Sequence, residues 1–207
     1  MSQNPTTFGA AGHYGVSATT GAIGAGASAN SEVLQFHWTS ATHFALINEV
    51  VVTGMRATTA FAAGNIDIKL TVARSFTVAG SGGTEIEFGG DSHIDNAALR
   101  TSMTDSKIGD MRIASTAALT AGTQSLEDND LGQIVTHSSG GAGAATPIIG
   151  SIYLPENVLF KADPSAGLYP LVLAENEGFV VRATVPITGV WNIGFRVRWA
   201  EIEEGRF

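Results

Sequence analysis

The sequence of 207 residues contains no cysteine. Without thiols the chain can form neither a disulfide framework nor a thiolate metal site. A protein of this composition is compatible both with a reducing cytoplasm and with survival outside a cell. The redox state of the compartment therefore places no restriction on where the protein works.

Basic residues are scarce: 11 Lys and Arg face 19 Asp and Glu, which gives a formal net charge of −8. Proteins that bind DNA or RNA need Lys and Arg to displace counterions from phosphates, so we expect no nucleic-acid partner. All charged residues together make up 14% of the chain, against about 25% in a typical soluble domain. A surface so poor in charge is typical of one covered by other protein copies, although small polar residues can also solvate it.

Long apolar runs are lacking as well. No stretch approaches the roughly 20 residues that a membrane-spanning helix needs, so we expect no membrane partner. The first residues, MSQNPTTFGAAGHYG, lack the basic and apolar regions of a signal peptide, and we expect none.

Residues 1–30 are low in complexity and consist mainly of Gly, Ala, Ser and Thr. Such a stretch buries too little apolar surface to offset the entropy lost when it becomes ordered. We interpret residues 1–30 as an N-terminal arm, either disordered or ordered against a neighbouring subunit. Residues 31–207 are then expected to form a single domain.

The strongest positive signal is an alternation with a period of two in residues 191–199, where every second position is apolar: Trp191, Ile193, Phe195, Val197 and Trp199. This period predicts a β-strand with one buried face and one solvated face. Residues 33–38, 66–79 and 178–185 alternate in the same way, whereas residues 44–56 are apolar on both faces and predict a strand buried on both sides. Weaker strand signals lie at 111–115, 131–137, 148–154, 157–161 and 168–174.

Turns and short loops separate these segments. Glycine-rich stretches predict a turn at 80–83 and a loop at 138–146, and Asp95 is placed to cap a short helix that would end near Met103. About eight to ten strands with so little helix predict an all-β fold. Because the strands alternate rather than run solidly apolar, the sheets should be antiparallel. The predicted fold is an antiparallel β-sandwich or jelly roll with an extended N-terminal arm.

Motifs for catalysis are absent from the sequence. It contains neither a G-x-x-x-x-G-K-[ST] phosphate loop nor a G-x-S-x-G nucleophile elbow. An approximate dinucleotide motif at Gly24, Gly26 and Ala29 follows no predicted strand, so we attribute its glycines to the composition of the arm. We therefore predict that the protein is not an enzyme and has no catalytic residues and no cofactor.

The histidines lack metal-ligand spacing. His37 and His43 flank a predicted turn and could meet in space, but the sequence offers no third ligand for a metal. Asp91 and Asp95 lie near His93 without matching any known site. We interpret all of these residues as ordinary polar groups and predict no metal.

One acidic segment has the composition of a calcium loop. Glu127, Asp128 and Asp130 supply hard oxygen ligands, but Gly132 falls where such a loop needs a ligand, and no bidentate glutamate follows. A solvated acidic turn is the favoured interpretation. Cation binding at Glu127–Asp130 remains the alternative.

Two stretches resemble a family of tailed-bacteriophage virion structural proteins. They are LRTSMTDSKIGDMRIASTAALTAGTQSL at 99–126 and LYPLVLAENEGFVVRATVPITGVWNIGFRVRWAE at 168–201, in which EGFVVRATVP and TGVW carry most of the likeness. The resemblance implies a place in the virion, assembled in the host cytoplasm, and favours a capsid decoration or cement protein. It implies as partners the major capsid protein and copies of the chain itself, as a homo-oligomer with a trimer favoured. We expect the contacts in residues 1–30 and in the loops around 80–95 and 138–147.

Two other functions stay open. A host-attachment or glycan-binding module of a head fibre or tail would stack aromatic rings on sugars, and the candidates are Tyr14, Tyr153 and Tyr169, since the three tryptophans are predicted to be buried. A hydrolase acting on cell-surface polysaccharide would need two carboxylates about 5–10 Å apart across a groove. The sequence does not distinguish capsid, tail, neck and fibre positions.

Overall fold

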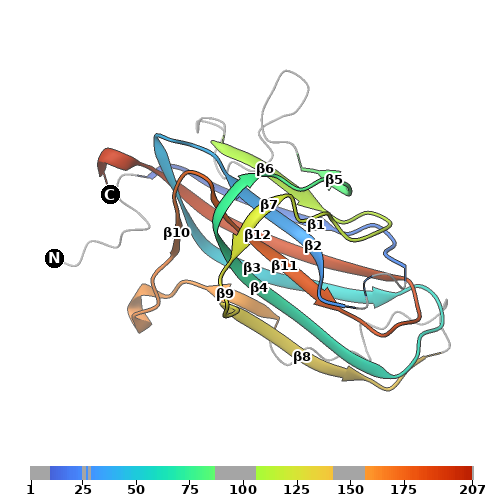
Figure 1. Ribbon diagram of the computed structural model, residues 1–207. Coiled ribbons are helices and arrows are strands. Elements are labelled where there is room, and N and C mark those ends of the chain that lie inside the picture. The colour runs from blue at the N-terminus through green and yellow to red at the C-terminus, as the bar shows by residue number, and fades with distance from the viewer. Residues whose placement is uncertain (1–9, 25–26, 28, 87–105, 142–156, 207) are drawn as a thin grey trace.

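The computed structural model describes residues 10–24, 27, 29–86, 106–141 and 157–206. This part of the chain forms β-strands and short 3₁₀ helices, and it contains no α-helix. The strands build two antiparallel sheets that pack against each other, which confirms the predicted all-β sandwich (Figure 1).

Sheet A contains five strands: β1 (Ala10–Thr19), β12 (Trp191–Glu203), β3 (His43–Ala57), β10 (Leu171–Leu173) and β9 (Val158–Lys161). Sheet B contains seven: β5 (Thr84–Glu85), β6 (Ile108–Ile113), β2 (Ser31–Trp38), β11 (Glu177–Thr184), β4 (Gly64–Val78), β7 (Thr123–Leu126) and β8 (Gly132–Ser138). Two 3₁₀ helices, η3 (Pro164–Ala166) and η4 (Glu204–Arg206), follow β9 and β12. The long strands β3, β4 and β12 cross most of the molecule (Figure 1).

Strands from the first half of the chain pair with strands from the second half in reverse order. β1 pairs with β12, β2 with β11, β3 with β10 and β9, and β4 with β8 and β7. These pairings together resemble one long hairpin whose two arms are the two halves of the chain. Because β12 also pairs with β3, and β11 with β4, the hairpin folds over into two sheets. The pairing order is that of a jelly roll.

Aromatic side chains hold the two layers together. Trp199 of sheet A meets Phe36 of sheet B edge-on, with ring centroids 5.5 Å apart, and Phe36 stacks on Phe179 at 5.0 Å. The predicted inner face of 191–199 is confirmed, because all five apolar side chains of its alternation are buried in the core. Burial of large rings on a shared inner face is the main stabilising contribution of this strand.

The irregular pattern of residues 44–56 comes from two bulges in β3. Relative to β12, β3 has an extra residue at Asn48 and another at Thr53. Each extra residue reverses the alternation, so the inward side chains are spaced by two and by three: Ala45, Ile47, Val50, Val52, Met55 and Ala57. Leu46 and Val51 on the outer face are buried as well, as the sequence predicted.

The alternation of residues 66–79 does not keep one face throughout. The side chains of Ile66, Ile68, Leu70 and Val72 point into the core. The pairing of β4 with β7 then shifts between Ala73 and Ser75. Phe76 therefore packs outside the core with Ala73 and Val180, and Val78 is exposed. The predicted continuation of one apolar face through Phe76 and Val78 is wrong because the irregularity reverses the parity.

Part of the predicted arm is a strand of the sandwich. Residues 10–19 form β1 and pair with β12, and Tyr14 is 1% exposed. Ile23 forms an isolated β-bridge with Trp191 and is fully buried. Ala27 is 1% exposed. Small residues contribute backbone hydrogen bonds to the sheet, while a few apolar side chains enter the core, so low complexity did not prevent order here.

The remaining local predictions divide between confirmed and untested. Gly82 and Gly83 adopt positive φ, which confirms the turn at 80–83. Residues 114–126 form a loop followed by β7. The helix predicted at 95–103 and the strand at 148–154 lie outside the described residues.

Candidate functional site

Two of the three carboxylates in the acidic segment Glu127–Asp130 pair with cations of the same chain. Asp130 accepts hydrogen bonds from Thr71 Oγ1 at 2.6 Å and Arg182 Nη2 at 3.0 Å, and Lys69 Nζ lies 3.4 Å away. Glu127 accepts a hydrogen bond from Arg74 at 2.8 Å. These oxygens are engaged in holding β4, β11 and the β7–β8 loop together.

The electrostatics of Asp130 agree with this structural role. Partial burial raises the pKa of Asp130, but the hydrogen bonds from Thr71 and Arg182 and the charge of Lys69 outweigh it and lower the pKa overall. A carboxylate with a lowered pKa stabilises the fold above its ordinary titration range, and that stabilisation disappears as the pH falls. In the described part of the chain, no group of three or more acidic or histidine side chains is placed to hold a metal ion.

The two histidines that could have met lie in different sheets. His37 is on the outer face of sheet B, where its ring stacks on Phe76 with centroids 4.6 Å apart. Burial lowers the pKa of His37. His43 begins β3 in sheet A, where its Nδ1 contacts Thr42 Oγ1. The pair forms no common ligand set.

The tyrosines proposed for sugar stacking differ in exposure. Tyr14 is buried, so its assignment as a surface candidate is wrong, because β1 belongs to the sandwich. Tyr169 is 67% exposed and follows η3, while Tyr153 lies outside the described residues. The three tryptophans are buried, as predicted.

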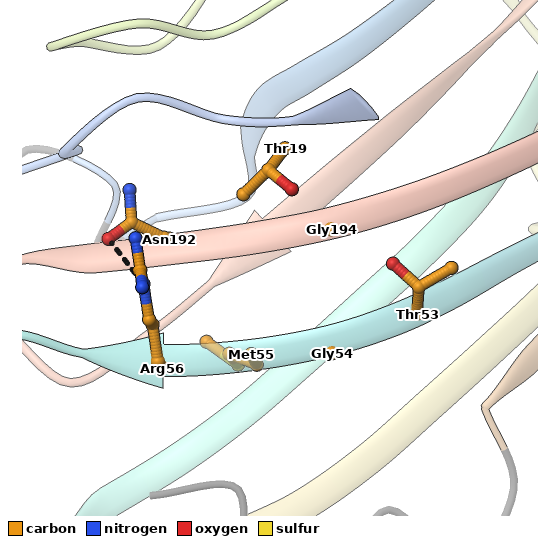
Figure 2. Close-up of a pocket in the computed structure, with 7 residues that line it drawn as sticks. All are labelled: Thr19, Thr53, Gly54, Met55, Arg56, Asn192 and Gly194. Carbon is orange, nitrogen blue, oxygen red and sulfur yellow. Dashed lines mark hydrogen bonds between the residues drawn. The ribbon is translucent and has the colours of Figure 1, made fainter. Parts of the chain in front are cut away.

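A hollow on the outer face of sheet A is the best candidate site. It encloses about 340 Å³ and is lined by residues of β1, β12 and β3: Thr19, Thr53, Gly54, Met55, Arg56, Asn192 and Gly194. Figure 2 shows Thr19 and Thr53 on the two sides of Gly194, with Arg56 and Asn192 at one end. Its volume is at the lower end of the range for small-ligand pockets.

Two facing glycines form the floor of the hollow. Gly54 of β3 is paired with Gly194 of β12, next to the bulge at Thr53. A Cβ at position 194 would lie 2.5 Å from Thr53 Oγ1, so a larger residue there would require the exposed Thr53 side chain to move. A Cβ at position 54 would meet no atom within 4 Å, and the φ of Gly54 is not positive. No steric contact in the described chain therefore requires glycine at position 54, which lies beside the bulge at Thr53.

Arg56 supplies the charge of the hollow. Its Nε donates to Asn192 Oδ1 at 3.2 Å (Figure 2). Asn192 Nδ2 in turn donates to the carbonyl of Thr20 at 3.0 Å. Asn192 is 7% exposed and is thus fixed in place. Within the described chain no carboxylate pairs with Arg56, so its outer nitrogens are available to a ligand that accepts hydrogen bonds.

The same face carries more cations than anions. Along β12 the outward positions after Gly194 are Arg196 and Arg198, and both contact Glu49 of β3. Arg196 binds Glu49 through two nitrogens, at 3.0 and 3.2 Å. The outer face of this strand pair therefore carries three arginines and one carboxylate, which contacts two of them, in a protein with a net charge of −8.

Sequence patterning did not predict this hollow. The only signal was glycine at two positions inside strongly apolar strands, where it weakens the strand and marks a close approach of another group. The described lining contains neither carboxylates nor histidines, so it offers no acid–base pair for hydrolysis. The comparisons with protein-family models, curated proteins and solved structures found no match for this chain.

A second polar site lies between the sheets, where Glu201 is 1% exposed. Its Oε1 accepts hydrogen bonds from Ser106 Oγ at 2.6 Å, the backbone N–H of Lys107 at 3.0 Å and Trp199 Nε1 at 3.1 Å. This carboxyl therefore fastens the segment before β6 to sheet A. Burial raises the pKa of Glu201, and the hydrogen bonds from Ser106, Trp199 and Lys107 only partly oppose it.

We expect Glu201→Gln to change the pH dependence of stability. A carboxyl whose pKa is raised by folding binds more protons in the folded state, so its contribution falls as the pH rises above the ordinary glutamate range. At low pH the protonated carboxyl and the amide that replaces it are both neutral and accept the same hydrogen bonds, so the two proteins should agree in stability within about 1 kcal/mol. As the pH rises from about 4 to 8, the variant should become progressively more stable relative to the wild type in urea unfolding. A stability difference that stays constant with pH would contradict the raised pKa.

Proposed function

We propose that the protein is a bacteriophage virion structural protein that decorates the capsid and stabilises the shell. Its partners are the major capsid protein and further copies of the chain, with a trimer favoured, and it works in the virion after assembly in the host cytoplasm. The resemblance of residues 99–126 and 168–201 to virion proteins supports this proposal, as does a composition with 14% charged residues. The shell-binding surface in this proposal is the outer face of sheet A.

The observation that carries the proposal is the open glycine at position 54. Glycine inside a strand costs about 0.5–1 kcal/mol relative to alanine. At Gly194 an added Cβ would crowd Thr53, but at Gly54, beside the bulge, no steric contact of the described chain accounts for the cost. A partner that approaches the backbone of β3 at this point would account for it.

The charges on this face indicate the chemistry of the partner. Arg56 can bind a carboxylate through two nitrogens, a geometry that lysine cannot provide. Arg196 and Arg198 extend the positive character along β12. The proposed occupant of the hollow is therefore a carboxylate-bearing loop of the major capsid protein, seated between Thr19 and Thr53. Complementary charge would also speed docking on the shell.

The test is co-sedimentation with shells of the chain's own phage from which the chain has been stripped. We expect the wild-type chain to bind and Gly54→Val to bind at least tenfold more weakly, because the valine side chain fills the hollow. The matched control is Gly205→Val, since a Cβ added at Gly205 also meets open space but lies in η4, outside the hollow. Both variants should unfold at the same urea concentration as the wild type, or a higher one.

Each result bears on a different part of the proposal. A wild-type chain that does not sediment with shells would refute the decoration role. Equal binding by wild type and Gly54→Val would refute the hollow as the docking surface. Weaker binding by Gly205→Val as well would indicate a general effect of added bulk.

The hollow also favours a second candidate function, a glycan-binding or host-attachment module. Its lining of hydroxyl, amide and guanidinium groups suits one sugar ring that carries a carboxylate. The lining has no aromatic ring for stacking, which makes the protein partner the better fit. A glycan array that includes sialylated and uronic-acid glycans should show no binding if the decoration role is correct. Binding abolished by Gly54→Val would favour the glycan function instead.

A further inference from the structure

The edges of the two sheets are not equally protected. In sheet A the edge opposite β1 is built from the short strands β9 and β10, and in sheet B the edges are formed by β5, β7 and β8. Natural proteins keep sheet edges from pairing with other chains by short strands, charges, prolines or bulges. β1 is the exception among the described strands, because it is ten residues long and pairs with β12 alone.

β1 also lacks the other protective features. Residues 10–19 include neither a charged residue nor a proline, if histidine is counted as neutral. The register with β12 is continuous from Gly12 to Thr19, and the single irregularity lies before Gly12. Such an edge, without charge, proline or a bulge between Gly12 and Thr19, is a template for another strand.

The backbone geometry shows which groups face outward. Thr20 donates its N–H to the carbonyl of Ile193 at 2.9 Å, so positions of even number in β1 face β12. The N–H and C=O groups of Gly15, Ser17 and Thr19 therefore point away from β12. No described residue outside β12 forms a hydrogen bond with these three backbones. Ser17 and Thr19 are exposed.

We propose that this edge pairs with the same edge of a second copy, as an antiparallel contact centred on Ser17. The proposal rests on the self-association in the proposed function, names its surface, and gives a dimer in place of the trimer favoured there. In this register Ser17 faces the second copy's Ser17, and Gly15 faces the second copy's Thr19. Self-pairing of one edge is isologous, so it closes as a dimer and leaves the outer face of sheet A free.

The charge and burial of β1 indicate that its partner is a second copy of the chain. Residues 15–19 carry no charge in a chain with a net charge of −8, so two copies meet at this edge without placing like charges opposite each other. On the inner face, Val16 and Ala18 are only partly buried against the core. The same residues of a second copy would cover them and extend both the sheet and the apolar layer.

The absence of cysteine makes the pairing directly testable. Residues opposite each other in a hydrogen-bonded antiparallel pair have Cα atoms about 5.5 Å apart, within the range of a disulfide. Under mild oxidation the purified variant Ser17→Cys should form a disulfide-linked dimer at micromolar concentration. Ser75→Cys is the matched control, because Ser75 is also an exposed strand serine but lies in β4, inside sheet B. It should cross-link at least tenfold more slowly.

Sedimentation equilibrium of the cysteine-free chain supplies the second measurement. We expect a dimer whose dissociation constant rises about tenfold or more in Ser17→Lys, which places two like charges at the centre of the contact. The variant Ser17→Pro removes the outward N–H and should have the same effect. Unchanged circular dichroism and urea midpoint would show that either variant is folded, and Ser17→Lys alone suffices if the proline variant is not.

The outcomes separate this inference from the proposed function. A monomeric wild-type chain, a trimer, or a dimer that survives both Ser17 substitutions would overturn the edge pairing. None of these results bears on the proposed binding to capsid shells, which is tested separately with Gly54→Val. Conversely, a dimer that dissociates on substitution at Ser17 supports the edge pairing even if the chain does not bind capsid shells.

Discussion

Tyr14→Ala is expected to lower the free energy of unfolding by about 3–5 kcal/mol, the usual cost of truncating a large buried ring. Tyr14 is 1% exposed, and its ring stacks on Trp199 with centroids 5.5 Å apart and an interplanar angle of 20°. Its removal leaves a cavity beside Trp199, which itself contacts Phe36 of the other sheet. Urea unfolding followed by tryptophan fluorescence measures the change.

Tyr169→Ala is the matched control, since it makes the same substitution at a ring that is 67% exposed. Substitutions at such surface positions change stability by about 0.5 kcal/mol or less. If residues 10–19 were a disordered arm, both variants would have wild-type stability. That result would remove β1 from the sandwich and with it the edge proposed to pair with a second copy.

Strict alternation was sufficient to predict the strands that face the core on one side. Residues 191–199 and 33–38 lie in strands with their large apolar side chains buried, as the period of two required. The antiparallel pairing also followed from that period. These predictions succeed because the alternation is imposed by local geometry and by one dominant core.

Bulges are the first reason why other predictions failed. The extra residues Asn48 and Thr53 in β3, and the shift after Ala73 in β4, reverse the side on which the next residue lies. A bulge depends on the partner strand rather than on its own sequence, so a period of two cannot reveal it. Phe76 consequently packs outside the core, although it continues the apolar parity of β4.

Distance along the chain is the second reason. Gly54 and Gly194 become neighbours only through the register of β3 and β12, which is itself set by the bulge at Thr53. β1 likewise owes its order to β12, which supplies both the backbone partners and Trp199. The composition of residues 10–19 shows how much apolar surface they can bury. It does not show the hydrogen bonds and ring contacts that a distant strand provides.

Gly132→Ala is the second substitution with a large expected effect. Gly132 begins β8 in sheet B, and an added Cβ would collide with the carbonyl oxygen of Leu159 in β9 of sheet A. Both atoms belong to backbones held in their sheets, so no side chain can move aside. The edge where the two sheets meet would have to open.

We expect Gly132→Ala to lower the free energy of unfolding by about 3 kcal/mol, at the upper end of overpacking costs. Gly54→Ala makes the identical change in open space and should be neutral or stabilising by up to about 1 kcal/mol. Urea unfolding of both variants measures the contrast. Equal stabilities would mean that β8 and β9 do not approach each other as described, and that the sandwich is open along this edge. A loss in Gly54→Ala alone would mean that the hollow is filled by the chain itself, which would remove the reason for placing a partner there.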